Sequence, residues 1–244
     1  MKKLFIFDLD NTLSESRTRI DPDMAGLLCE LLSRGQVAVI SGATFTQFED
    51  QLVRGLSCEG LFSHLSILAT SGGELWVYRS GSWHRLYSAL MSEDARATLI
   101  KAVVALADIP LGREKSFIDD RGTQVTYSAL GLDADMEKKK AYDPDEKKRR
   151  DFVGKIAPRF PEFSFNIGGT TSIDITMKGI DKSFGIKKLL EHAKIAPSEA
   201  VFVGDALYEG GNDSAARKSG VEVIATSGPE ETRSIIRGFL SQKI

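Results

Sequence analysis

Neither sign of charge dominates this sequence: 34 acidic and 32 basic residues leave a net charge of −2, and the pI is about 6.0. A chain without a basic excess lacks the electrostatic pattern by which proteins bind nucleic acid. Long apolar runs are scarce too. The N-terminus, MKKLFIF, is basic and then apolar, but it breaks at Asp8 and is too short for a membrane span or a signal peptide. We therefore expect a cytoplasmic protein whose partners include neither nucleic acid nor a membrane.

Cysteine and histidine are also scarce. Cys29 and Cys58 are the only cysteines, and both lie in apolar or mixed surroundings. Free buried thiols are the favoured state there, and they suit a reducing compartment, so we expect no disulfide. The three histidines, His64, His84 and His192, show no metal-ligand spacing, and we assign no role to them.

Strand and helix patterns alternate in the first and last parts of the chain. KKLFIFDLD and QVAVISG are typical of strands, and the segment from Asp21 to Gly35 is typical of a helix with an aspartate N-cap and a glycine stop. The alternation returns from residue 181 onward, including a helix expected over NDSAARKSG. This pattern predicts an α/β fold with a parallel, Rossmann-like sheet covered by helices.

The middle of the chain follows a different pattern. One amphipathic helix and two hairpins are predicted, the hairpins turning at residues 121–122 and 168–169. The charged stretch from residue 137 to 150 mixes both signs, which is typical of a solvated helix face. The expected domains are a discontinuous α/β core, residues 1–81 and 179–244, and an inserted α+β cap, residues 82–178.

Four short motifs lie at the ends of predicted core strands or open the helix that follows. They are Asp8-Leu9-Asp10-Asn11-Thr12, Ser41-Gly42, Asp181-Lys182, and Gly204-Asp205 with Gly210-Gly211-Asn212-Asp213 behind it. In open parallel sheets, ligands bind outside the carboxyl ends of the strands, so these side chains can converge. Each motif alone has an ordinary explanation as a turn or a helix cap, whereas four in this order favour one site.

These motifs, in this order, resemble those of the haloacid dehalogenase (HAD) superfamily of phosphohydrolases, whose first motif is DxDxT. The resemblance covers nearly the whole chain and is closest to the Cof-type and eukaryotic-type phosphomannomutase-like subgroup. The segments GGTTSIDITMKGIDKSFGI and GDALYEGGND are particularly similar to the mutase versions. The resemblance implies a three-layer HAD core whose inserted cap sets substrate specificity.

The chemistry of phosphoryl transfer explains the residue types. The reaction needs an in-line nucleophile and positive charge on the phosphoryl oxygens. Asp8 is our candidate nucleophile, forming an aspartyl-phosphate, and Asp10 would act as general acid and base. Lys182 would neutralise the nucleophile and a phosphoryl oxygen, while Ser41 and the N–H of Gly42 would hydrogen-bond the phosphoryl group.

Two carboxylates one residue apart, beside a phosphate dianion, require a cation. Mg²⁺ suits the site because it prefers hard oxygen ligands and keeps several waters beside a substrate phosphate. By resemblance, its ligands are Asp8, the backbone carbonyl of Asp10, and Asp205, with Asp213 in or near the coordination shell.

The resemblance also assigns residues to the substrate, a small phosphorylated sugar. Arg17 matches an arginine that the family places just after DxDxT, and Ser172 and Asp174 match contacts to sugar hydroxyls. Arg121 and Gln124 would add polar groups to this pocket. Relatives in the mutase subgroup dimerise through the cap, which makes a homodimer an expectation for this chain.

The cap decides between hydrolysis and a mutase reaction. A mutase must hold a sugar bisphosphate in both directions, which needs a second anion site. Eukaryotic-type phosphomannomutases build that site with arginines, and two of these positions fall on Glu114 and Leu132 here. Each lost charge-assisted bond costs about 1.5–3 kcal/mol, so losing two weakens the site by roughly 10²–10⁴ in affinity.

We therefore expect a Mg²⁺-dependent sugar-phosphate phosphatase. The alternative is a phosphomannomutase that interconverts mannose 1-phosphate and mannose 6-phosphate. A phospho-accepting signalling module is disfavoured because it needs neither Asp10 nor a large insertion. A catalytically inactive binding protein is disfavoured because no catalytic position is visibly replaced.

Overall fold

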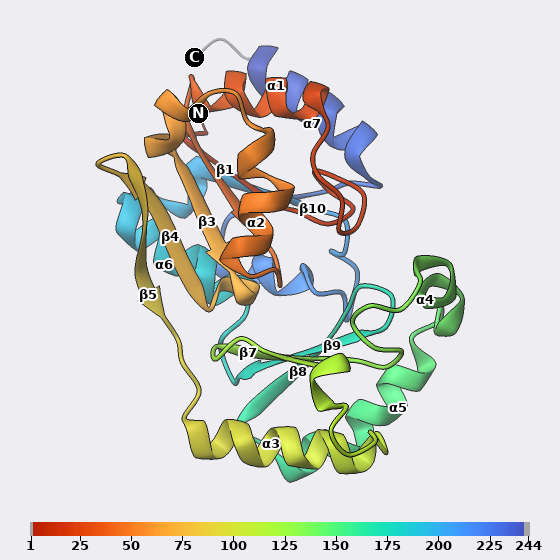
Figure 1. Cartoon of the computed structure of the whole chain (residues 1–244). Coiled ribbons are helices and arrows are strands. Elements are labelled where there is room, and N and C mark those ends of the chain that lie inside the picture. The colour runs from red at the N-terminus through yellow and green to blue at the C-terminus, as the bar shows by residue number, and fades with distance from the viewer. Residues whose placement is uncertain (1, 242–244) are drawn as a thin grey trace. The chain divides into compact units, whose positions relative to one another are not determined.

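The computed structural model describes residues 2–241, which form two compact units. The core unit comprises Met1–Ser88 and Asp181–Ile244, and the cap unit comprises Ala89–Ile180. The first boundary lies after Ser88 rather than after Gly81, because the segment between them forms a strand of the core sheet. Figure 1 shows the elements of each unit.

The core unit is built on a seven-stranded sheet with the order β11-β10-β1-β2-β3-β4-β5. Five neighbouring strands are parallel, and the last two are antiparallel at one edge. This parallel-dominated sheet confirms the predicted fold class. The strands are β1 (Leu4–Asp8), β2 (Gln36–Ile40), β3 (Leu65–Ala69), β4 (Glu74–Arg79), β5 (Ser82–Ser88), β10 (Ala200–Gly204) and β11 (Glu222–Ala225).

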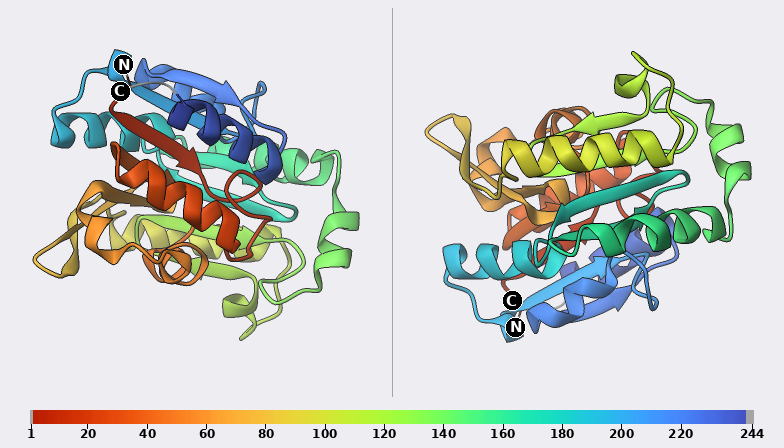
Figure 2. Two further views of the ribbon diagram at one scale, coloured as in Figure 1. Left: turned by 90° about the horizontal axis from the view of Figure 1, so that it is seen from above. Right: turned by 90° about the horizontal axis from the view of Figure 1, so that it is seen from below.

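Helices cover both faces of this sheet, as Figures 1 and 2 show. One face packs against α1 (Pro22–Leu32), α2 (Phe45–Gln51) and α7 (Pro229–Ser241), and the other packs against α6 (Lys182–Ala193). The four central strands β1, β2, β3 and β10 are almost wholly buried, which explains their near-continuous apolar sequences. In the described residues, no helix has the length and apolarity that crossing a bilayer requires.

The helix ends follow the expected capping chemistry. The Asp21 side chain accepts a hydrogen bond from the Met24 N–H at the start of α1, as the sequence predicts.

The helix expected over NDSAARKSG is instead a short 3₁₀-helix, η7 (Ser214–Ser219). Four further 3₁₀-helices connect elements of the core: η1 (Val53–Gly55), η2 (Glu59–His64), η3 (Thr70–Gly72) and η6 (Pro197–Glu199).

The cap unit is an antiparallel sheet with helices on one face (Figure 1). Its order is β6-β7-β9-β8, and its apolar face packs against α3 and α5. The elements are α3 (Glu93–Leu106), η4 (Glu114–Ser116), β6 (Ile118–Asp120), β7 (Gln124–Ser128), α4 (Met136–Tyr142), α5 (Lys147–Ile156), η5 (Ala157–Arg159), β8 (Phe163–Gly168) and β9 (Ser172–Met177).

The charged stretch of the cap is only partly solvated, contrary to the sequence-based prediction. Lys139 and Arg149 are each 3% exposed. The Lys139 ammonium donates to the Leu132 carbonyl at 2.6 Å, and the Arg149 guanidinium pairs with the buried carboxylate of Asp143 at 2.9 Å. Mixed charges along a sequence therefore conceal a buried ion pair, because pattern alone does not show which residues face a partner.

Cys29 and Cys58 form a disulfide, so the prediction of two free thiols is wrong. Cys29 lies on α1, and Cys58 immediately precedes η2, with a Cα–Cα distance of 5.8 Å. Both side chains pack against the same apolar cluster, a proximity that a separation of 29 residues does not reveal. Because the two cysteines are bonded, they give no reason to expect a reducing compartment.

Removing this disulfide is expected to destabilise the core unit. In the chain-entropy model, a loop closed over 29 residues contributes about 3.5 kcal/mol to the free energy of unfolding. The double variant Cys29→Ser/Cys58→Ser should lose that amount in urea unfolding followed by circular dichroism. Dithiothreitol should weaken the unmodified protein and leave the variant unchanged; equal stability of both proteins under oxidising conditions would contradict the bond's role.

Candidate active site

The candidate catalytic residues of the core unit lie where three neighbouring parallel strands end. Asp8 ends β1, Ser41 follows β2, and Asp205 follows β10. The register pairs Asp8 with Ile40 of β2 and Phe7 with Val203 of β10, so these strands end at the same edge. Parallel pairing thus places polar side chains from distant parts of the sequence side by side.

Lys182 lies between two carboxylates at this edge. Its ammonium is 2.5 Å from Asp8 Oδ1 and 2.5 Å from Asp213 Oδ1, and all three side chains are at most 5% exposed. The N-cap Asp181 accepts from the Phe184 N–H and thereby starts α6 at Lys182. The sequence predicted the pairing of Lys182 with Asp8, and the structure adds its pairing with Asp213.

A close backbone contact sets how near α6 comes to the strand ends. A Cβ atom at Gly185 would lie 2.7 Å from the Cα of Gly72 in η3. Only glycine at both positions permits this approach, since such a contact is shorter than real Cβ atoms tolerate. The first turn of α6, with Lys182, is held at the site by this packing.

Burial governs the protonation of the cluster. Burial raises the pKa of Asp8 well above its ordinary value, although the Lys182 ammonium opposes the shift. Burial also raises the pKa of Asp205, and the nearby Asp213 carboxylate adds to this effect. For Lys182, burial by itself lowers the pKa, but Asp213 and Asp8 outweigh it and the net pKa is raised. Lys182 therefore stays protonated, but its single positive charge does not balance the carboxylates of Asp8, Asp205 and Asp213.

The carboxylates of Asp8, Asp205 and Asp213 fit a divalent cation. Each offers an oxygen, and the three oxygens lie within 4.8 Å of one another. Hard carboxylate oxygens are the donors that Mg²⁺ and Ca²⁺ prefer. Asp213 Oδ1 already accepts from Lys182, and its Oδ2 accepts from the Ala206 N–H at 3.0 Å. These bonds favour Asp8 and Asp205 as direct ligands, with Asp213 orienting the lysine behind them.

Asp10 is not one of the three clustered carboxylates, although its charge contributes to the raised pKa of Asp8. Its Oδ1 accepts from the backbone N–H of Arg17 at 2.6 Å, and its Oδ2 accepts from the Ser41 hydroxyl at 3.3 Å. Arg17 adopts a left-handed backbone conformation, with φ of 60°, and its side chain is exposed. The structure therefore shows a backbone contact for Arg17, where the sequence assigned it a side-chain role toward the substrate.

Ser41 and Gly42 lie between β2 and α2, as predicted. The Ser41 side chain is 4% exposed, and its hydroxyl also accepts from the Ala43 N–H at 3.3 Å. Thr12 belongs to the same edge, because its hydroxyl donates to Asp205 Oδ1 at 3.5 Å. The DxDxT pattern contains Thr12, yet the sequence reasoning gave it no role.

Within the cap unit, Gln124, Ser172 and Asp174 lie on the polar face of the sheet, and Arg121 lies in the turn between β6 and β7. The Gln124 amide donates to the Thr126 hydroxyl at 3.0 Å, which in turn donates to Asp174 Oδ1 at 2.8 Å. Ser172 pairs across β9 and β7 with Ser128. Arg121 forms an ion pair with Asp119 at 2.8 Å. The sequence missed Thr126, although its spacing of two from Gln124 already placed it on the same face.

Comparison with solved structures identifies the class of fold. The chain superposes on a haloacid dehalogenase-like hydrolase from Bacteroides thetaiotaomicron with a TM-score of 0.68 and 16% identity, covering 98% of this chain and 100% of that one. It also matches an IMP-nucleotidase from Plasmodium falciparum with a TM-score of 0.68 and 14% identity, covering 99% and 68% respectively. Together with the strand-end carboxylates, these likenesses define a protein of the HAD fold.

Comparison of sequences identifies the family. Residues 24–242 match the model of the family described as eukaryotic phosphomannomutase, and this chain belongs to that family. A phosphomannomutase of Solanum lycopersicum is 30% identical over 235 residues, covering 93% of this chain and 90% of that protein. A phosphomannomutase of Spinacia oleracea is 28% identical over 218 residues, covering 85% and 83%. The predicted resemblance is thereby confirmed.

Proposed function

We propose that this protein is a phosphoryl-transfer enzyme that interconverts mannose 1-phosphate and mannose 6-phosphate through an aspartyl-phosphate at Asp8. Family membership over residues 24–242 carries this proposal. The sequence alone placed sugar-phosphate hydrolysis first, whereas the names of the relatives favour the mutase reaction. We therefore place the mutase first and keep hydrolysis as the second candidate.

In the proposed mechanism, a carboxylate oxygen of Asp8 attacks the phosphorus of a hexose bisphosphate. The ester bond to the sugar oxygen breaks, and Asp10 supplies the proton that this oxygen takes up. The mannose 6-phosphate product leaves, and mannose 1-phosphate enters and attacks phospho-Asp8 through its C6 hydroxyl, whose proton goes to Asp10. The O–P bond to Asp8 breaks, and the bisphosphate formed turns over to present its C1 phosphate to Asp8 for the next transfer. Lys182 stabilises the negative charge on Asp8 and on the phosphoryl oxygens throughout.

Asp8 and Asp205 would hold a Mg²⁺ ion, with the backbone carbonyl of Asp10 as a further ligand. When bound, such an ion supplies positive charge to the phosphoryl oxygens as a Lewis acid. The burial that raises the pKa of both Asp8 and Asp205 supports this assignment, because a cation there would compensate the charge that burial penalises.

Magnesium is therefore expected to stabilise the protein as well as to activate it. At 100 times its dissociation constant, Mg²⁺ should add about 2.7 kcal/mol to the free energy of unfolding. Differential scanning fluorimetry with EDTA and then with excess MgCl₂ measures this effect. The variant Asp205→Asn should lose most of the shift, and Asp119→Asn, a cap carboxylate outside the cluster, should retain it. Equal Mg²⁺-dependent stabilisation of both variants would show that the metal binds at a site other than Asp205.

Hydrolysis is supported by two residues of the cap. Glu114 and Leu132 stand where the resemblance places arginines of the second anion site. The Glu114 carboxylate accepts from the Gly112 N–H at 3.1 Å and brings negative charge to the segment before β6. A cap of this composition favours release of a monophosphorylated product over its retention for a second transfer.

One assay separates the two reactions. The enzyme is given mannose 1-phosphate, Mg²⁺ and a trace of mannose 1,6-bisphosphate, and both mannose 6-phosphate and free phosphate are followed. The mutase proposal predicts that mannose 6-phosphate forms much faster than phosphate. Release of phosphate without mannose 6-phosphate would establish the hydrolase instead. If neither product forms, both proposals are wrong.

A further inference from the structure

The core unit contains a hollow of about 680 Å³ that the proposed reaction does not use. Aromatic rings line it from three directions: Phe45 of α2, Trp76 and Tyr78 of β4, and Trp83 of β5. All four side chains are only partly buried. Clustered aromatic area of this kind is costly to leave in water and is typical of a binding surface.

The hollow lies beside the antiparallel edge strands β4 and β5, and no residue of the Asp8 cluster lines it. Strand β4 runs antiparallel to β3, so its first residue pairs with the last residue of β3, near the catalytic edge. Tyr78 lies near the other end of β4, beside the turn into β5, where it pairs with Trp83. The hollow therefore has lining residues of its own within the same unit, and Phe45, four residues after Ser41, is the lining residue nearest in sequence to the catalytic residues.

The rings form one connected group. Phe45 stacks on Trp76 with centroids 4.1 Å apart, and the Tyr78 and Trp83 rings meet edge to face at 5.4 Å. Phe62 of η2 also lines the hollow; it is buried, and its ring meets Tyr78 edge to face at 5.5 Å. Such mutual packing fixes the ring orientations before any ligand arrives, which lowers the entropy cost of binding.

The charge around the rings is negative. Glu49 and Glu59 line the hollow, and Glu59 accepts a hydrogen bond from the Tyr78 hydroxyl at 2.9 Å. Among the described residues that line it, Arg54 carries the only positive charge, and this charge pairs with Asp50 outside the lining. The two lining carboxylates outnumber the one lining arginine, so the hollow repels phosphate esters and attracts cations.

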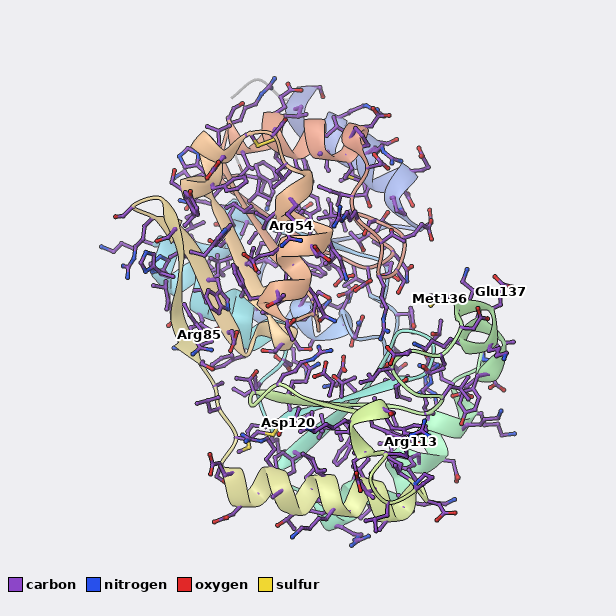
Figure 3. All side chains as sticks on the ribbon, viewed as in Figure 1. Arg54, Arg85, Arg113, Asp120, Met136 and Glu137 are labelled. Atoms are coloured by element: carbon purple, nitrogen blue, oxygen red, sulfur yellow. A yellow bond between two sulfur atoms is a disulfide. The ribbon has the colours of Figure 1, made fainter. Side chains whose placement is uncertain are left out.

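The same aromatic cluster already holds one cation of the protein. The Arg85 guanidinium lies 5.5 Å from the centroid of the Trp76 ring and is bonded to Glu74 at 2.9 Å. Figure 3 labels Arg85 on β5 and Arg54 near α2. A cation over an indole ring beside a carboxylate is thus a combination that this surface stabilises. A second indole ring and a second carboxylate, those of Trp83 and Glu59, line the hollow.

We propose that the hollow between α2, η2 and the β4–β5 hairpin binds a small organic ammonium ion. The rings of Tyr78 and Trp83 would contact its alkyl groups and its charge, while Glu49 and Glu59 would balance that charge. This site is distinct from the sugar-phosphate site, whose ligand is anionic, and it does not depend on the proposed function.

Tryptophan fluorescence tests this proposal directly, because Trp76 and Trp83 are the only tryptophans in the chain. The full-length protein is titrated with choline and, separately, with its neutral analogue 3,3-dimethylbutan-1-ol at constant ionic strength. Choline is expected to change the emission saturably, with a Kd about tenfold or more below that of the alcohol. Identical curves for the two compounds, or no saturable change, would overturn the proposal.

Variants locate the bound charge. Glu59→Gln should raise the choline Kd about three- to tenfold, and Glu49→Gln should act in the same direction. The matched control is Glu191→Gln, an exposed glutamate on α6 that pairs with Lys188 and should leave the Kd unchanged. An equal Kd in Glu59→Gln and Glu191→Gln would show that choline binds elsewhere.

Self-association of the protein is a second possible cause of a fluorescence change. Sedimentation at the titration concentrations should therefore show that choline leaves the molecular mass of the protein unchanged. A fluorescence change that accompanies self-association would assign the hollow to a second copy of the chain and contradict the proposal.

Discussion

Lys182→Met is expected to lower the rate of phosphoryl transfer by about 10³-fold, the largest loss we expect of any substitution that leaves Asp8 in place. The ammonium is 2.5 Å from Asp8 and 2.5 Å from Asp213, so its removal leaves two buried carboxylates facing each other. Loss of one preorganised donor to a developing charge costs about 10²–10³ in rate, and here a full charge is lost.

The matched control is Lys188→Met, on the same helix but exposed and paired with Glu191. It should keep full activity, which excludes an effect of lysine removal on α6 itself. Lys182→Arg retains the charge with a different geometry and should recover part of the rate. Circular dichroism checks that each variant is folded. Activity of folded Lys182→Met close to that of the unmodified enzyme would remove the lysine from the mechanism.

Arg149→Met is expected to destabilise the cap unit by about 3–5 kcal/mol. Its partner Asp143 is fully buried, and the guanidinium also donates to the carbonyls of Gly168 and Gly169 at 3.2 and 2.9 Å. Substitution therefore strands a buried carboxylate and two carbonyls in the turn between β8 and β9. Hydrogen exchange of residues 163–177 should show the loss directly.

The pH dependence gives this prediction a second measurement. Burial alone would raise the pKa of Asp143, but hydrogen bonds from Lys148 and Arg149 outweigh it and lower the pKa below its ordinary value. A carboxylate with a lowered pKa stabilises the fold at higher pH, and this contribution is lost as the pH falls through the lowered value. The variant should show less of this acid-induced loss.

The control is Arg150→Met, because Arg150 is the neighbouring arginine but is 55% exposed, paired with Glu146. An exposed pair contributes about 0–1 kcal/mol, so this variant should remain nearly as stable as the unmodified protein. Equal losses from both substitutions would mean that the general charge of α5, and not the buried pair, stabilises the cap.

The sequence predicted the elements whose signals are local. The aspartate N-cap of α1 and the turns at residues 121–122 and 168–169 depend on neighbouring residues and appear where expected. The convergence of Asp8, Ser41 and Asp205 also followed from the predicted parallel sheet, since the carboxyl ends of parallel strands share an edge.

Features that depend on tertiary contacts were beyond the sequence. The pairing of Cys29 with Cys58 requires α1 and the segment before η2 to meet on one apolar face. Burial of Arg149 depends on the turn after β8, which lies about 20 residues away in sequence. The contact between the Arg17 N–H and Asp10 depends on a left-handed loop conformation that an arginine does not signal.

In both proposed reactions, the mutase and the hydrolase, Asp8 becomes covalently phosphorylated. The most direct measurement is mass spectrometry of peptides from an acid-quenched reaction with Mg²⁺ and mannose 1,6-bisphosphate. We expect an added phosphoryl group on the peptide that contains Asp8, and none on the same peptide of Asp8→Asn. A phosphoryl group on another residue of an enzyme that turns over would contradict phosphorylation of Asp8. So would the absence of any phosphorylated residue together with an active Asp8→Asn variant.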